Sequence, residues 1–116
     1  MSQFMMLLVE DDPLQREVFA DILKGEGFEV VECATAEAAE IVIATSGVEF
    51  RAVVADQNLD GRMLGSELAA FAHRMFPRLN FVLMSGKAPP PGLPGNSRFL
   101  RKPFMAEDLL TAVRAG

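Results

Sequence analysis

Short apolar runs alternate with longer amphipathic stretches along most of the chain. A continuous apolar run of four to six residues is typical of a strand that is covered on both faces of a parallel sheet. The pattern predicts five strands, at 5–9, 29–33, 51–55, 81–84 and 97–100, and four helices, at 13–25, 36–45, between residues 66 and 77, and at 106–114. Strands that alternate with helices indicate a parallel sheet with helices on both faces.

Polar residues and glycines mark the expected ends of these helices. Asp12 precedes Pro13, which is the order of an N-cap followed by proline at the first helical position. Ser66 is the expected N-cap of the third helix, and Gly25 is the expected stop of the first.

The alternation fails after the fourth strand. Residues 88–95 contain four prolines and two glycines, and neither residue type sustains a helix. The sequence therefore predicts an irregular loop where a fourth crossover helix would complete the pattern. We interpret this loop as a connection, although a proline-rich segment can also present an extended ligand to a partner.

Composition narrows the class of protein. The 116 residues are enough for one domain with one core, so a single domain over 1–116 is expected. A net charge of −5 gives no attraction to nucleic acid. Cys33 is the only cysteine, so no internal disulfide can form, and no stretch has the form of a membrane span or a secretory signal. A cytoplasmic location is the expectation.

Polar residues follow the predicted strands. Glu10 and Asp11 follow the first strand, Asp56 the third, Ser85 the fourth and Lys102 the fifth. The carboxyl ends of parallel strands meet at one edge of a sheet, where doubly wound proteins bind ligands. Three carboxylates within ~5 Å of one another repel by roughly 3 kcal/mol per pair, so such a cluster needs a cation or protons.

The donor types favour magnesium and phosphoryl chemistry. Carboxylate oxygens suit Mg²⁺, whereas zinc would need more than Cys33 and His73. Asp56 is then a candidate nucleophile towards phosphorus, while Mg²⁺ and Lys102 neutralise the transferring oxygens and Ser85 donates a hydrogen bond to them. Lys102 stands before Pro103, an order that fits a fixed turn with either a trans or a cis peptide bond.

Together these residues resemble the receiver domains of bacterial two-component response regulators. The resemblance spans nearly the whole chain and rests on four motifs: LVEDD at 8–12, DQNLDG at 56–61, Ser85-Gly86 and KPF at 102–104. It implies a flavodoxin-like fold with the strand order 2-1-3-4-5, which is known for receiver domains and is taken from the resemblance. It also implies a phosphoryl donor, either a histidine kinase or a histidine phosphotransfer protein, and a downstream protein partner.

The resemblance assigns a role to each site residue. Asp56 would be the phosphoacceptor and Asp11 a direct Mg²⁺ ligand, with Glu10 acting through water and Asn58 through its backbone carbonyl. Ser85 and Lys102 would bind the phosphoryl group. Phe99 matches the aromatic position whose rotamer reports switching in such domains. Because phenylalanine lacks a hydroxyl, however, the residue type alone favours a core aromatic.

Two intervals depart from the usual receiver pattern. The spacing from Asp56 to Gly65 is one residue longer than the most frequent one, which the family tolerates. The interval from Ser85 to Lys102 is several residues shorter. The surface made by the fourth helix, the fifth strand and the last helix commonly carries partner contacts in receivers. Without that helix, we expect any signal to leave through the proline-rich loop, the last helix or another face.

Two other functions fit parts of the sequence. A Mg²⁺-dependent phosphohydrolase with an aspartyl-phosphate intermediate would place a second aspartate two positions after Asp56, where Asn58 stands and cannot transfer protons. A phosphate-independent interaction module would keep the fold and the pocket without the chemistry. The sequence fits a stand-alone regulator as well as a segment of a longer one.

Overall fold

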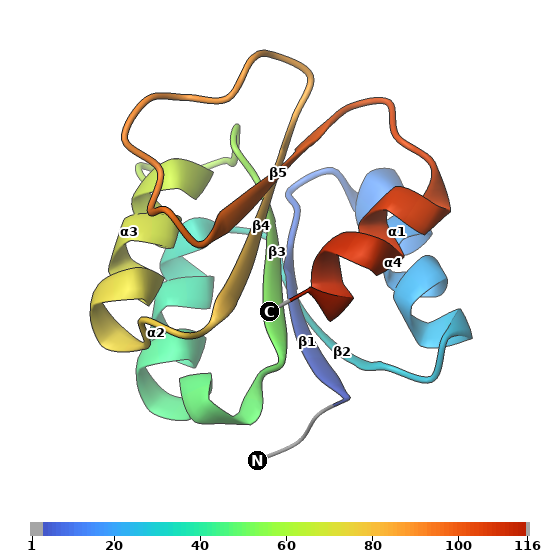
Figure 1. The fold of residues 1–116 in the computed structure, drawn as a ribbon, viewed down its shortest axis with the longest axis horizontal. Coiled ribbons are helices and arrows are strands. Elements are labelled where there is room, and N and C mark those ends of the chain that lie inside the picture. Colours follow the sequence, from blue (N-terminus) through green and yellow to red (C-terminus); the bar gives the residue numbers. More distant parts are fainter. Residues whose placement is uncertain (1–3, 116) are drawn as a thin grey trace.

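A computed structural model describes residues 4–115 as a five-stranded parallel sheet with helices on both faces (Figure 1). The strand order is β2-β1-β3-β4-β5, which confirms the flavodoxin-like prediction. The elements are β1 (Met5–Val9), α1 (Pro13–Gly25), β2 (Glu29–Cys33), α2 (Ala36–Ser46), the 3₁₀ turn η1 (Gly47–Glu49), β3 (Ala52–Asp56), α3 (Gly65–Met75), β4 (Asn80–Ser85), β5 (Ser97–Arg101) and α4 (Ala106–Arg114). Within these residues no helix is long and apolar enough to cross a bilayer.

The three central strands are buried on both faces. Successive side chains of a strand point to opposite faces, so β1 turns Leu7 towards α2 and α3 and Leu8 towards α1 and α4. Two hydrophobic cores result, one on each side of the sheet. This two-sided burial explains why the sequence of these strands shows continuous apolar runs instead of alternation.

The end of α1 agrees with the prediction. Gly25 is the last residue of the helix, and the amide of the next residue, Glu26, bonds to Leu23 O at 3.2 Å. The chain then turns at Gly27, whose φ of 90° lies in the left-handed region that favours glycine. Two glycines therefore mark the end of α1 and the turn that follows it.

The predicted cap of α3 is wrong. The helix begins at Gly65, and Ser66 lies inside its first turn. The side chain of Gln57 takes the capping role: Oε1 accepts from Ser66 N at 2.7 Å, and Nε2 donates to Ser66 Oγ at 3.0 Å. Gly65 N also donates to Gln57 O at 3.0 Å. A side chain from the end of β3 therefore satisfies amides that a local cap satisfies in other helices.

The proline-rich connection contains no helix, as predicted. Between β4 and β5 the described chain forms only turns and bends. Leu93 packs against the core on the α2 and α3 side, and Asn96 Nδ2 donates to Pro77 O at 2.8 Å. In Figure 1 this orange segment passes over the α3 side of the molecule.

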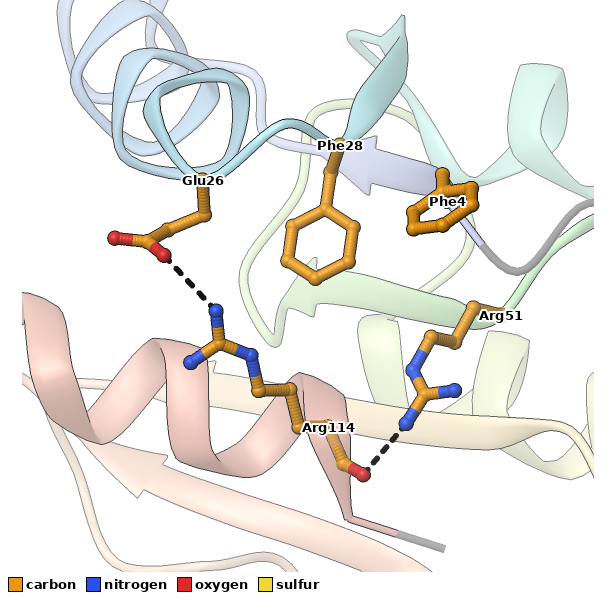
Figure 2. Close-up of a pocket in the computed structure, with 5 residues that line it drawn as sticks. All are labelled: Phe4, Glu26, Phe28, Arg51 and Arg114. Atoms are coloured by element: carbon orange, nitrogen blue, oxygen red, sulfur yellow. Dashed lines mark hydrogen bonds and ion pairs between the residues drawn. The ribbon is translucent and has the colours of Figure 1, made fainter.

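Arg51 and Arg114 link the end of α4 to the segments that precede β2 and β3 (Figure 2). Arg114 Nη2 pairs with Glu26 Oε2 at 2.9 Å, and its guanidinium lies 5.8 Å from the ring centroid of Phe28. Arg51 Nη2 donates to the backbone oxygen of Arg114 at 2.7 Å. These residues border a surface cavity of about 350 Å³. The contacts satisfy a helix-end carbonyl and join α1, β3 and α4.

Candidate functional site

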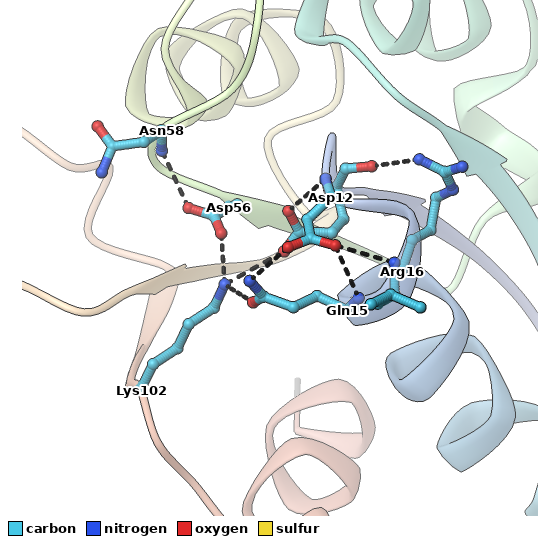
Figure 3. Close-up of polar contacts among 8 residues, drawn as sticks. Asp12, Gln15, Arg16, Asp56, Asn58 and Lys102 are labelled. Carbon is cyan, nitrogen blue, oxygen red and sulfur yellow. Dashed lines mark hydrogen bonds and ion pairs between the residues drawn. The ribbon is translucent and has the colours of Figure 1, made fainter.

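The predicted site residues lie at the carboxyl edge of the sheet, after β1, β3, β4 and β5. Glu10 follows β1, Asp56 ends β3, and Lys102 follows β5. The structure brings these three side chains together, as Figure 3 shows for Asp56 and Lys102. Each of the three residues stands at the carboxyl end of a strand in the sequence. Because the strands are parallel, these ends lie at the same edge of the sheet and the side chains meet there.

The ammonium group of Lys102 is the centre of the site. It hydrogen-bonds to Asp56 Oδ2, to Glu10 Oε1 at 3.1 Å and to Gln15 Oε1 at 2.6 Å. It also lies 5.4 Å from the ring centroid of Phe19. The Lys102-Pro103 peptide bond is cis, one of the two predicted states, and Lys102 N donates to the backbone oxygen of Ser85 at 2.8 Å.

Asp56 is held by its neighbours in an almost buried position. The residue is 8% exposed. Its Oδ1 accepts a hydrogen bond from Asn58 N at 3.0 Å, and its Oδ2 faces the ammonium of Lys102 (Figure 3). Each carboxylate oxygen therefore has one donor in place, which fixes the orientation of the carboxylate at the end of β3.

Glu10 is the most buried acid of the site, at 1% exposure. Its Oε2 accepts from Asp12 N at 3.2 Å. Burial, reinforced by the charge of Asp56, raises the pKa of Glu10 to about 7. Burial lowers the pKa of Lys102, but its hydrogen bond to Asp56 and the charges of Asp56 and Glu10 outweigh that effect, so the pKa lies above the usual lysine value. The pocket therefore concentrates negative charge around one ammonium.

The structure brings together two of the three predicted carboxylates. Asp11 is partly exposed, and among residues 4–115 no three acidic, histidine or cysteine side chains form a group that could hold a metal in this arrangement. Lys102 instead lies between Glu10 and Asp56 and offsets part of their charge. Asn58 contributes its backbone N–H to Asp56, and the predicted use of its carbonyl as a metal ligand stays a prediction.

Ser85 ends β4 at the carboxyl edge, whereas Phe99 lies within β5, opposite Leu83. Ser85 is buried, and its Oγ accepts from Lys87 N at 3.1 Å, which fixes the start of the loop after β4. Phe99 is half-buried and packs against the core on the α2 and α3 side. The core interpretation of Phe99 agrees with this packing, and the switch role of both residues stays a prediction.

Sequence reasoning missed two polar residues of α1 that brace the pocket. Gln15 Nε2 donates to Asp12 Oδ2 at 3.3 Å while its Oε1 accepts from Lys102. Arg16 Nη1 donates to the backbone oxygen of Glu10 at 2.8 Å. Both are visible in Figure 3. The only sequence signal is their place in the first turn of a helix that starts at an acidic cap.

Glu37 is a third residue that the sequence did not single out. Its Oε2 accepts from Arg62 N at 2.8 Å and from Met63 N at 2.9 Å. Gly61, at φ 106°, lies so close that a Cβ there would meet Glu37 Oε1 at 2.5 Å. We call this contact between α2 and residues 61–63 the Glu37 clamp. It fixes the loop that begins with Asn58.

The fold and the pocket define a class of protein. The strand order is that of flavodoxin-like doubly wound domains, which bind ligands at the carboxyl ends of their strands, and in this chain two acids and a lysine meet at that edge. The profile of the response regulator receiver domain matches residues 6–114, and the chain therefore belongs to this family. Domains of this family are signalling modules and not conventional enzymes.

The chain is also similar in sequence and in fold to individual proteins of this family. The chain is 36% identical over 113 residues to the response regulator protein FleR of Pseudomonas aeruginosa, an alignment that covers 93% of this chain and 23% of FleR. A receiver protein from Sinorhizobium medicae is 30% identical, with a TM-score of 0.83 over 95% of this chain and 90% of that one.

A third similar protein is described with a metal. The receiver domain of the sensor histidine kinase PA1611 from Pseudomonas aeruginosa, 21% identical with a TM-score of 0.81, covers 95% of this chain and 93% of its own. That structure has a magnesium ion coordinated in the active-site cleft. At this identity the likeness to our chain concerns the fold alone.

Proposed function

We propose that Asp56 accepts a phosphoryl group in a two-component or phosphorelay pathway, and that the modification changes which partner the domain binds. The observation that carries the proposal is the placement of the Asp56 carboxylate, nearly buried and bonded to the Lys102 ammonium that Glu10 also holds. A carboxylate fixed beside a cation is suited to attack phosphorus while the cation neutralises the transferring oxygens.

Phosphoryl transfer from a histidine of the donor to Asp56 needs no further reactant. A carboxylate oxygen of Asp56 forms a bond to phosphorus as the bond from phosphorus to the histidine nitrogen of the donor breaks, and that nitrogen keeps the electron pair. The ammonium of Lys102 then has a phosphoryl oxygen as a partner in addition to carboxylate oxygens. The added group carries about −1.5 to −2 charges, so it redistributes the contacts of Lys102 and of Ser85.

The donor set fits Mg²⁺. Two carboxylates and one ammonium leave a net negative charge in the pocket, and all the acidic donors are hard oxygens. Asp11, Asp56 and the carbonyl of Asn58 would hold the ion, with Glu10 acting through water. When bound, the ion supplies charge neutralisation for the transferring oxygens.

Exposed apolar side chains beside the pocket offer a docking surface to the phosphoryl donor. Leu14 and Val18 project from α1 with 74% and 55% exposure, and Met105 is 73% exposed before α4. Exposed apolar patches next to a site commonly mark protein contacts. A histidine kinase or a phosphotransfer protein is the expected partner. We also propose that the domain is cytoplasmic and that residues 1–116 form one receiver domain.

The proposal is tested by intact-mass analysis after incubation with acetyl phosphate, with and without Mg²⁺. We expect one added phosphoryl group that depends on Mg²⁺, that is absent in Asp56→Asn and that persists in Asp60→Asn, a matched change at an exposed aspartate of the same loop. If no adduct forms while beryllofluoride also fails to bind, the phosphate-independent interaction module becomes the better function. Net turnover of a phosphorylated small molecule would instead favour a phosphohydrolase.

A further inference from the structure

One edge of the sheet is free along β5. This strand pairs only with β4, and its register sets Leu83 opposite Phe99 and Met84 opposite Leu100. Lys102 N donates to Ser85 O, so the even-numbered residues of this segment turn their backbone groups towards β4. Backbone groups of successive strand residues point to opposite sides. The N–H and C=O groups of Phe99 and Arg101 therefore point away from the sheet.

A groove runs beside this free edge. It has a volume of about 580 Å³ and lies between β5 and α4, with walls that include Pro103, Phe104, Thr111 and Ala112. The proline-rich connection does not fill it, because that segment packs Leu93 against the core on the other side of the sheet (Figure 1). The groove thus offers unpaired backbone groups beside a wall that combines apolar side chains, such as Phe104 and Ala112, with polar ones.

The charge of this edge is opposite to that of the whole chain. The chain carries 16 acidic and 11 basic residues, yet β5 holds Arg98 and Arg101 and no acid. Both arginines are exposed. Arg101 Nε donates to Gly86 O at 3.1 Å. Asp108 is the one acid of the groove among the described residues, and its carboxylate already accepts from Met105 N at 3.0 Å.

We propose that β5 binds an extended acidic segment of a partner protein as an added strand. The backbone of the segment pairs with the free N–H and C=O groups of Phe99 and Arg101. Arg98 lies on the α4 side of the sheet, as Leu100 does, and Arg101 lies on the opposite side, as Phe99 does. Two carboxylates three positions apart in the segment therefore face one arginine each. A second copy of this chain fits less well, since a β5–β5 seam would gather four arginines. The inference stands apart from phosphoryl transfer, because none of these groups is a proposed ligand of the phosphoryl group.

Amide hydrogen exchange followed by NMR tests the free edge first. In the free protein the amides of Leu100 and Lys102 should exchange slowly, and those of Phe99 and Arg101 should exchange fast. Slow exchange at Phe99 and Arg101 in the dilute free protein would show that the edge is already covered, and the proposal would be wrong.

A peptide titration tests the occupant. The probe is a peptide of about nine residues that alternates valine with threonine and carries two glutamates three positions apart, the spacing of Arg98 and Arg101. Two variants carry N-methyl groups on the amides of one edge or of the other. Strand addition uses a single peptide edge, so we expect one N-methylated variant to lose binding and the other to keep it. The parent peptide should protect the amides of Phe99 and Arg101.

Charge reversal tests the role of the two arginines, with the same reversal elsewhere on the surface as its control. The double variant Arg98→Glu with Arg101→Glu should weaken binding about tenfold, whereas Arg62→Glu with Arg74→Glu, the same change elsewhere on the surface, should not. Equal binding by both N-methylated peptides, no binding at millimolar peptide, or an unchanged affinity after charge reversal would each overturn the proposal. Protection that rises with protein concentration alone would identify a second copy as the occupant instead.

Discussion

Replacement of Gly65 by alanine is the sharpest test of how β3 and α3 meet. An ideal Cβ at this position would lie 2.2 Å from the backbone oxygen of Asp56 and 2.8 Å from Leu83 Cδ1. The first neighbour is backbone, so relief requires the start of α3 or the end of β3 to move by about 1 Å or more. Overpacking of this kind costs about 1–3 kcal/mol.

The expected change in melting temperature follows from the length of the chain. With an unfolding entropy near 2.1 cal/mol/K per residue, a chain of 116 residues has about 0.24 kcal/mol/K. The Gly65→Ala variant should therefore melt about 4–12 °C below the parent. Thermal melts and urea titrations followed by circular dichroism give the measurement.

Gly25→Ala is the matched control. It is also a glycine at a helix end, but no atom lies within 4 Å of its added Cβ and its φ is not positive. Alanine in a helix is preferred over glycine by roughly 0.5–1 kcal/mol, so this variant should melt about 2–4 °C higher. A Gly65→Ala protein that melts with the parent, while Gly25→Ala shifts as expected, would refute the close approach of α3 to β3.

Three further predictions concern other contacts. Asn80→Leu should cost about 1–3 kcal/mol, since the buried amide donates to the Ala112 and Ala115 carbonyls at 2.9 Å; an unchanged urea midpoint would contradict this. The backbone amides of Glu37 itself and of Arg62 hold the pKa of Glu37 below its usual 4.5, so its stabilisation is present above about pH 4.5 and is lost as the pH falls through the folded-state pKa. Glu37→Gln should make the urea midpoint less sensitive to acid, and equal acid sensitivity of the two proteins would argue against the clamp. Saturating Mg²⁺ should raise the melting temperature of the parent, by an equivalent of about 2.7 kcal/mol at 100 times Kd, and raise that of Glu10→Gln less; equal shifts would remove Glu10 from the metal site.

The strands and the site edge were predictable because their signals are local. Two-sided burial leaves continuous apolar runs in β1 and β3, and the polar residue that ends each run marks the carboxyl edge. The proline-rich loop was predictable for the same reason, since proline and glycine prevent a helix wherever they occur together.

The errors and omissions have a different cause. Ser66 has the residue type of a cap, yet the amide of Gln57 reaches the same helix start from β3 and takes its place. Gln15 acts through Lys102, which lies 87 positions away in the sequence. Contacts of this kind depend on how helices pack on the sheet, and no periodicity or local propensity encodes them.

The Glu37 clamp has a consequence for the exchange of parts between receiver domains. Residues 57–64 and the start of α2 form one unit, because the backbone amides of Arg62 and Met63 share a single carboxylate oxygen. A chimaera that imports this loop from a relative should therefore carry over the residue at position 37 as well. A continuous graft should therefore begin before α2, so that it includes the first turn with Glu37, and not at the start of the loop.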